Sequence, residues 1–199
     1  MSLFKSIILI TSTIFGAILF FTTGCNLLIP CPQEPKDRPY HIREVVFPGG
    51  AEGVKLAGEM TAPQTGGPFP AVILIAGSGP QNRNEDLSGH KVFLVLSDYL
   101  TRRGYVVLRY DKRGIGKSSG DYQMATMADF ADDAAAAMRW LKAQSDIDMA
   151  RIGFLGHSSG GYVAPLFSSC WRGQQGNSPR YVNTRVPYSP EQWERVKNG

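Results

Sequence analysis

The strongest indication of the fold is the stretch RIGFLGHSSGGYVAP, Arg151 to Pro165. An apolar run leads into a Gly-His-Ser-Ser-Gly turn, and small residues typical of a closely packed helix follow. Gly156, Ser158 and Gly160 match the pattern G-x-S-x-G, in which a serine stands on a sharp strand-to-helix turn. The pattern predicts that Ser158 is an exposed nucleophile, and the alternative is an ordinary serine that caps the next helix.

Upstream of this stretch, strand and helix patterns alternate. Two short strands around a turn cluster, at 42–47 and 54–60, predict an antiparallel pair. Apolar runs predict buried strands at 71–77, 105–111 and 151–157, with helices at 90–104 and 126–144 between them. This order predicts an α/β fold with a mostly parallel sheet and flanking helices. After Cys170 we expect no further strand, an open sheet edge and an irregular segment at 171–199.

The N-terminal residues 1–24 have the layout of a secretory signal, with an apolar run at 7–21 and small residues before Cys25. The stretch resembles a bacterial lipoprotein signal, which implies a lipid on Cys25; the alternative is an uncleaved anchor helix. Residues 25–40 are rich in proline and are expected to form an extended tether. We therefore expect an exported protein, either a membrane-anchored lipoprotein or a periplasmic protein.

Composition limits the other classes of function. With 43% hydrophobic and 19% charged residues, the chain is typical of a globular protein and not of a disordered one. The formal net charge of +4 is scattered along the sequence, so no nucleic-acid surface is expected. The three cysteines and three histidines show no metal-ligand spacing, and we expect neither a metal nor a cofactor.

A second glycine-rich turn, AGSGPQNRNE (76–85), follows the strand at 71–77. A backbone N–H in such a turn can bind the oxygen of a reacting carbonyl, and so can the N–H of Ser159 after the nucleophile. Ser78 is the preferred donor in this turn and Gly79 the next. A phosphate loop is the alternative for this turn and for GIGKSSG (114–120). The first lacks a third glycine, and the second has Asp111 where a P-loop requires glycine.

Four stretches in this order, AGSGPQNRNE, YDKRGIGKSSG, ATMADFADDAAAAMRWLK and IDMARIGFLGHSSGGYVAP, resemble the α/β-hydrolase superfamily. The likeness covers residues 42–167 and is strongest to bacterial serine esterases and lipases related to the serine aminopeptidase group. It implies an acyl-transfer enzyme with Ser158 as nucleophile, and Ser159 and Ser78 as oxyanion donors. It also implies that Asp111 and Arg113 shape the loop after their strand.

In this superfamily the acid and the histidine of the triad follow the serine in the sequence. Here the histidines are His41, His90 and His157, and none follows Ser158. We therefore expect residues 41–170 to be the N-terminal part of an α/β-hydrolase domain, truncated after the nucleophile helix, with the C-terminal strands missing. Ancestry predicts hydrolysis of small carboxylic esters through an acyl-Ser158 intermediate, with little activity in this chain. The alternatives are a peptidase or amidase of the same fold and a non-catalytic, membrane-tethered binding domain or relic.

Overall fold

The computed structural model describes residues 33–163 and 180–182. The chain divides into two units, Met1–Gln33 and Glu34–Gly199, and every described residue except Gln33 belongs to the second. The predicted signal segment, Cys25 and the first half of the tether lie outside the described residues. Within 33–163 and 180–182, no helix has the length and apolar character needed to cross a membrane.

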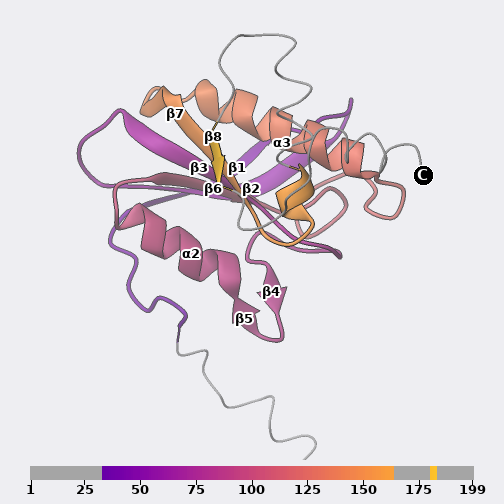
Figure 1. The fold of residues 1–199 in the computed structure, drawn as a ribbon, viewed down its shortest axis with the longest axis horizontal. Helices are drawn as coiled ribbons and strands as arrows, with labels where there is room; N and C mark the ends of the chain where they lie inside the picture. The colour runs from indigo at the N-terminus through magenta and orange to yellow at the C-terminus, as the bar shows by residue number, and fades with distance from the viewer. Residues whose placement is uncertain (1–32, 164–179, 183–199) are drawn as a thin grey trace, which may run out of the picture. The chain divides into compact units, whose positions relative to one another are not determined.

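Among the described residues, a six-stranded sheet in the order β1-β2-β6-β3-β7-β8 is the framework of the second unit (Figure 1). Its strands are β1 (His41–Pro48), β2 (Lys55–Ala62), β3 (Phe69–Ile75), β6 (Val106–Tyr110), β7 (Ile147–Gly156) and β8 (Arg180–Val182). β1 and β2 are antiparallel, and so are β2 and β6. β3 pairs in parallel with both β6 and β7. The predicted antiparallel opening pair and parallel centre are confirmed.

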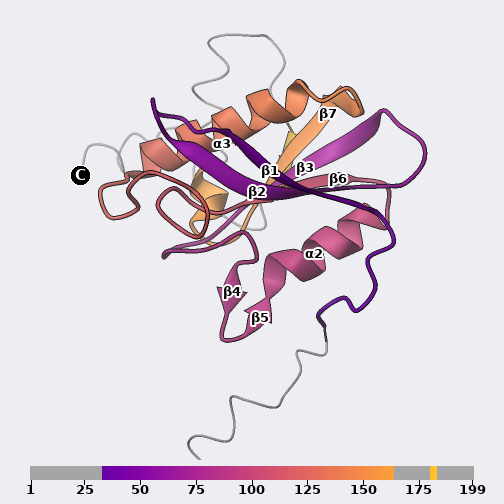
Figure 2. The ribbon, with the colours of Figure 1, turned by 180° about the vertical axis from the view of Figure 1, so that it is seen from behind.

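Two helices, α2 (Val92–Thr101) and α3 (Met127–Lys142), cover opposite faces of the sheet, as Figures 1 and 2 show. The strand β3 supplies both cores, because alternate side chains point to opposite faces. Ile73 and Ile75 pack in the cluster that contains Met138 and Leu141 of α3. Leu74 packs on the other face with Phe93 of α2. Burial on both faces explains the continuous apolar runs of the central strands.

The start of α3 follows from its sequence. The Thr126 side chain accepts a hydrogen bond from the Asp129 N–H, and the Asp129 carboxylate accepts one from the Thr126 N–H, which is a capping box. Arg139 and Lys142 lie in the last turn, where positive charge is favourable. A series of buried alanines lets this helix lie close to the sheet.

Three details differ from the sequence expectations. The residues after Cys170 add a short strand, β8, parallel to β7, so the sheet does not end at β7. Three residues are too few to give a periodic apolar signal. A hairpin of β4 (Asp86–Leu87) and β5 (His90–Lys91) precedes α2, so His90 lies in a strand and not at a helix start. The end of the expected tether is bound to the domain, since Tyr40 is buried and its hydroxyl donates to Asp98 (2.9 Å).

Candidate active site

The turn after β7 holds Ser158 in a left-handed backbone conformation, with φ of +52°. Such a φ is uncommon for a residue with a side chain. A helix N-cap has extended backbone, so Ser158 is not an ordinary cap, and its strained turn fits the G-x-S-x-G pattern. Ser158 is exposed, and the next helix begins at Gly160, whose N–H donates to the His157 carbonyl (2.8 Å). The hydroxyl is therefore open to solvent at the end of the strand.

The two glycines of the pattern are required by close backbone packing. A Cβ on Gly156 would collide with the carbonyl of Gly160, and a Cβ on Gly160 would collide with the carbonyl of Ile75 in β3. Both neighbours are backbone atoms, which cannot move aside as a flexible side chain can. The first turn of the helix therefore lies directly against the central strand, and this contact lifts Ser158 above the sheet edge.

Three loops meet at this edge, because β6, β3 and β7 run in parallel and end on the same side. They are residues 76–85 after β3, 111–125 after β6 and 157–159 after β7. Open α/β sheets bind ligands at this carboxyl edge. A Cβ on Gly77 would lie 3.1 Å from the Ser158 Cβ, so the first loop passes beside the serine.

Three successive carbonyls of the first loop, those of Gly77, Ser78 and Gly79, accept hydrogen bonds. The Lys112 ammonium donates to the carbonyl oxygens of Gly77 and of Gly79, the second at 3.1 Å. The Gln81 side chain donates to the Ser78 carbonyl (3.1 Å), and the Gln81 N–H donates to the Gly79 carbonyl (2.9 Å). In contrast, the N–H groups of Ser78 and Gly79 donate to no acceptor in the described part of the chain, and neither does the N–H of Ser159. All three predicted oxyanion donors are thus available.

Lys112 is unusual for a lysine because it is 8% exposed. Burial lowers the pKa of its ammonium, and the negative charge of Glu85 partly counters this effect. The ammonium also lies 4.9 Å from the ring centroid of Phe130, in a cation–π geometry. A buried charge needs such partners to offset its lost hydration.

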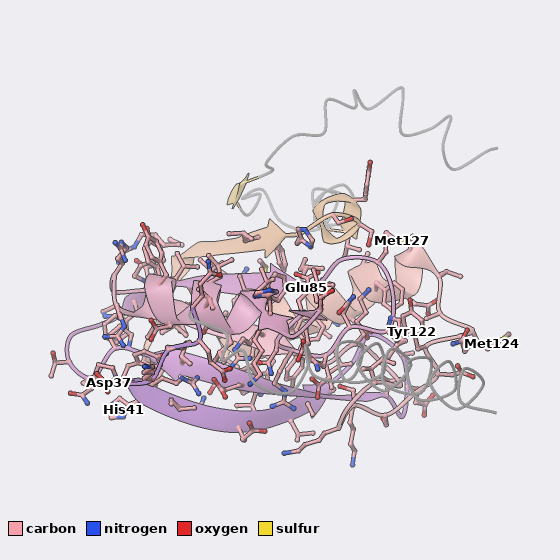
Figure 3. The ribbon with its side chains drawn as sticks, turned by 90° about the horizontal axis from the view of Figure 1, so that it is seen from below. Asp37, His41, Glu85, Tyr122, Met124 and Met127 are labelled. Carbon is pink, nitrogen blue, oxygen red and sulfur yellow. The ribbon has the colours of Figure 1, made fainter. Side chains whose placement is uncertain are left out.

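A cavity of about 150 Å³ opens between these loops and the start of α3. Three of its lining residues are the predicted oxyanion donors Ser78, Gly79 and Ser159, and Lys112 is a fourth. The remaining lining residues, all apolar or aromatic except Asp133, are Ile75, Ala76, Tyr110, Tyr122, Met127, Phe130, Asp133 and Val163. A cavity of this volume can hold a group the size of a benzene ring. Figure 3 shows Tyr122, Met124 and Met127 together on one side of the molecule.

Glu85 is a buried carboxylate beside the same loop, and its exposed fraction is 1%. Its Oε1 accepts hydrogen bonds from the Gly77 N–H (2.5 Å) and from His157 Nδ1 (2.9 Å). Its Oε2 has no hydrogen-bond partner among the described residues. Its backbone is also left-handed, with φ of +48°. The carboxylate joins the turn after β3 to the turn after β7.

The three histidines occupy different places. His157 is bonded to Glu85 and makes no hydrogen bond to Ser158 within the described part of the chain. His41 begins β1, which runs in the same direction as β6, so it lies at the amino edge, opposite the site. Figure 3 shows His41 and Met127 on opposite sides of the molecule with Glu85 between them. His90 lies in the β4–β5 hairpin.

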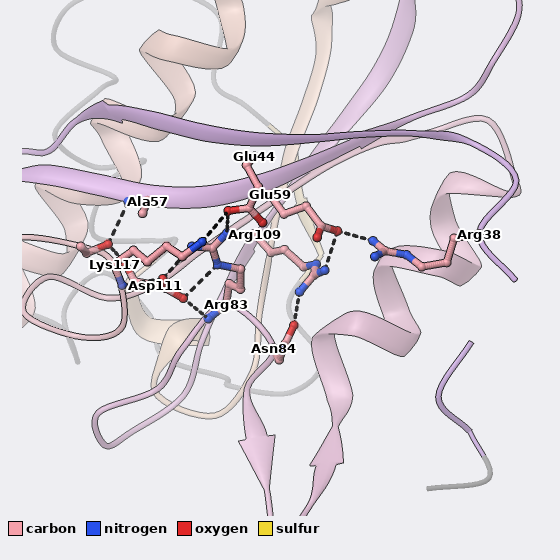
Figure 4. Close-up of polar contacts among 10 residues, drawn as sticks. Arg38, Glu44, Ala57, Glu59, Arg83, Asn84, Arg109, Asp111 and Lys117 are labelled. Atoms are coloured by element: carbon pink, nitrogen blue, oxygen red, sulfur yellow. Dashed lines mark hydrogen bonds and ion pairs between the residues drawn. The ribbon is translucent and has the colours of Figure 1, made fainter. Parts of the chain in front are cut away.

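A network of buried ion pairs holds the loops after β3 and β6 in place (Figure 4). Arg83 makes a bidentate contact with Asp111, with distances of 3.1 and 2.8 Å. Burial alone would raise the pKa of Asp111, but hydrogen bonds from Arg83 and from the backbone outweigh it and keep the pKa below the usual value. Arg109 joins Glu59 (2.6 Å) and also Asn84. Arg83 and Asn84 of the loop are therefore held by Asp111, which follows β6, and by Arg109 of β6.

The loop after β6 is shaped by Asp111 and Arg113, as the resemblance implied. The Asp111 carboxylate accepts from the Lys117 N–H (3.1 Å) and would collide with a Cβ on Gly116. Arg113 makes two bonds to Asp133, of 2.7 and 2.8 Å. The amide that a phosphate would need is therefore already bound to a carboxylate, which argues against the P-loop interpretation.

Sequence reasoning missed Glu85, Lys112 and Asp133 as parts of the site. They occur inside the motifs AGSGPQNRNE, YDKRGIGKSSG and ATMADFADDAAAAMRWLK, which was the only available signal. The directions of their side chains depend on tertiary packing, which spacing does not reveal. Residues 33–163 and 180–182 hold no cluster of His, Cys, Asp or Glu that could bind a metal ion.

This combination of a doubly covered, mostly parallel sheet and a left-handed serine in G-x-S-x-G defines an α/β hydrolase. The model of the X-Pro dipeptidyl-peptidase family (S15) matches residues 52–169, which is more than half of the chain. The chain belongs to this family of serine hydrolases.

Comparison with curated proteins gives the same class. The chain is 36% identical over 147 residues to Esterase EstD of Thermotoga maritima, covering 74% of this chain and 34% of the esterase. It is 32% identical over 157 residues to the uncharacterized protein Rv2307c of Mycobacterium tuberculosis, covering 75% of this chain and 50% of that protein. The chain thus spans about a third to a half of the length of these relatives.

Solved structures with the same fold include an esterase. The Pyrococcus furiosus esterase Pf2001 is 28% identical, with a TM-score of 0.58 over 75% of this chain and 52% of that one. The hypothetical protein PA2218 of Pseudomonas aeruginosa has a TM-score of 0.61 over 86% of this chain and 55% of that one. Its 20% identity shows the fold alone.

Proposed function

We propose that this chain carries the nucleophile and the oxyanion hole of a carboxylic ester hydrolase that works through an acyl-Ser158 intermediate. The observation that carries the proposal is the exposed, left-handed Ser158 beside a loop whose Ser78 and Gly79 amides are unbonded among the described residues. The two relatives named as esterases, from Thermotoga and Pyrococcus, support esters as the substrate class.

The proposed reaction has two balanced steps. The Ser158 oxygen forms a bond to the ester carbonyl carbon, and the resulting oxyanion accepts hydrogen bonds from the N–H groups of Ser159 and Ser78, with Gly79 adjacent. When the carbonyl reforms, the alcohol leaves with the serine proton. Water then attacks the acyl-serine, which releases the carboxylic acid and restores the hydroxyl. The apolar cavity that includes Phe130 and Met127 is suited to the acyl group.

Among the described residues, neither His157 nor His41 is placed to act as a base for Ser158. His157 is bonded to Glu85, and His41 lies at the opposite sheet edge. Loss of triad function costs on the order of 10⁴ to 10⁶ in turnover, since an unassisted serine is a weak nucleophile. We therefore propose that this chain alone reacts slowly.

The test is covalent labelling with a fluorophosphonate, which requires a reactive serine. We expect slow modification of Ser158, located by mass spectrometry and absent in Ser158→Ala, at a rate about 10⁴-fold below that of a serine hydrolase with a working triad. Rapid, Ser158-dependent labelling would show that the chain holds its own base. No modification of Ser158 at any probe concentration would favour the non-catalytic binding domain.

A peptidase is the second candidate, and the match to the X-Pro dipeptidyl-peptidase family favours it. The same serine and oxyanion donors would attack an amide carbonyl. Comparing a p-nitrophenyl ester with an Ala-Pro p-nitroanilide separates the two functions. The p-nitrophenyl ester also hydrolyses faster than the anilide in buffer alone. The proposal of an esterase requires that the ratio of the Ser158-dependent rates, ester over anilide, exceeds the ratio of these uncatalysed rates.

We also propose that the protein is exported and attached to a membrane through a lipid on Cys25. The support is the sequence of residues 1–25, which resembles a lipoprotein signal. In a bacterial host we expect palmitate to label the full chain and Cys25→Ser to abolish the label. An unlabelled wild-type chain that is recovered from the periplasm would contradict the lipid anchor and leave plain secretion.

A further inference from the structure

We infer that Lys112 is the positioning residue of the oxyanion hole, and that it acts on the Ser78 N–H through the Gly77–Ser78 peptide. The inference rests on the proposed function, because it deepens the role given there to Ser78. Its basis is the pair of hydrogen bonds from the Lys112 ammonium to the carbonyls of Gly77 and Gly79.

The direction of the Ser78 N–H follows from peptide geometry. The Gly77 carbonyl and the Ser78 N–H belong to one planar peptide group, and in a trans peptide they point in opposite directions. The carbonyl end is bound to Lys112, which approaches from the loop after β6. The N–H therefore points away from the ammonium. Ser78 is exposed and Gly77 packs against Ser158, so we place this N–H on the open side of the serine turn.

Lys112 also makes this N–H a stronger donor. A cation that binds the oxygen of a peptide draws electron density from its nitrogen, and linked hydrogen bonds strengthen one another in this way. The effect is larger here because Lys112 is buried and poorly screened by water. The adjacent Gly79 N–H receives no comparable charge, since the Ser78 carbonyl is bound by the neutral amide of Gln81.

Glu85 fixes the other end of the same segment. Its carboxylate accepts a hydrogen bond from the Gly77 N–H at 2.5 Å. The Gly77 N–H is thus held by a carboxylate and the Gly77 carbonyl by the Lys112 ammonium. The opposite charges of Glu85 and Lys112 also attract each other. The loop thus has little freedom to turn the Ser78 N–H elsewhere, and this preorganisation is what an oxyanion hole requires.

The experiment compares Lys112→Met with Lys117→Met, a matched control. Lys117 belongs to the same loop, but its side chain is 75% exposed and its ammonium pairs with Glu44 (3.6 Å). With a p-nitrophenyl ester, we expect Lys112→Met to lower kcat about 10- to 100-fold with little change in KM, since donors to an oxyanion act mainly in the transition state. We expect Lys112→Arg to restore part of kcat and Lys117→Met to match the wild type.

A second measurement does not depend on activity. The carbonyl ¹³C resonance of Gly77 reports its hydrogen bond, so it should move upfield in Lys112→Met and stay in place in Lys117→Met. If the wild type shows no Ser158-dependent turnover, the proposed function fails. The resonance still tests whether Lys112 is hydrogen-bonded to the Gly77 carbonyl. An unchanged resonance, or an unchanged kcat in an active protein, overturns the inference. Should Lys112→Met not fold, Lys112→Gln, which retains neutral donors, takes its place in both measurements.

Discussion

The substitution Gly160→Ala is expected to lower the free energy of unfolding by about 3 kcal/mol or more. The added Cβ would overlap the carbonyl oxygen of Ile75, and it would also lie 3.0 Å from the carbonyl oxygen of Ala76. Ile75 ends the central strand β3, which is hydrogen-bonded on both sides, so its backbone cannot move aside. The helix would have to shift away from the sheet, and the turn that holds Ser158 would open.

Urea unfolding monitored by circular dichroism measures this effect as a shift in the midpoint at constant slope. Ser159→Ala is the matched control, because it changes the neighbouring residue of the same turn without adding atoms. We expect it to stay within about 0.5 kcal/mol of the wild type. Equal midpoints for Gly160→Ala and Ser159→Ala would mean that the helix does not pack on β3 as described.

Replacing Arg113 by leucine is expected to lower the free energy of unfolding by about 3 to 5 kcal/mol. Arg113 makes two bonds to the Asp133 carboxylate, which is 1% exposed, and two more to Asp129, one to its carboxylate and one to its carbonyl (both 2.9 Å). The variant would leave the negative charge of Asp133 buried with only the Gly50 N–H as a partner among the described residues. An unpaired buried charge costs more than the pair contributes.

Two further variants make this prediction specific. Arg151→Leu breaks the exposed pair with Asp148 and should change stability by less than about 1 kcal/mol. The double variant Arg113→Leu with Asp133→Leu removes both buried charges and should recover part of the loss. A double variant that is less stable than Arg113→Leu would show that the pair stabilises the fold beyond avoiding an orphaned charge.

Most of the fold could be predicted because its central strands are apolar on both faces. The runs at 71–77 and 105–111 correspond to β3 and β6, and the alanine-rich pattern corresponds to α3. Periodicity did not reveal the β4–β5 hairpin or β8, whose strands have two or three residues. It also placed the start of β7 at Arg151, whereas the strand begins at Ile147. This four-residue difference includes exposed positions with no apolar pattern.

The backbone of the site was easier to predict than its side chains. Glycine spacing identifies a turn, because only glycine tolerates the contacts at Gly156 and Gly160. The roles of Lys112 and Glu85 depend on how the loops after β6 and β3 meet in space. In the sequence alone, each residue is indistinguishable from an ordinary charged surface residue. The prediction that Ser158, Ser78, Gly79 and Ser159 form one catalytic group awaits the labelling experiment.

The buried arginine–carboxylate network beneath the loops has a consequence for heat tolerance. Removing ions from water becomes less costly as temperature rises, because their hydration carries an unfavourable entropy. The contacts of Arg83 with Asp111, Arg109 with Glu59 and Arg113 with Asp133 are all largely shielded from solvent. Warming therefore lowers the desolvation cost of these buried ion pairs, and the loops beside Ser158 should be among the last parts of this domain to lose their shape.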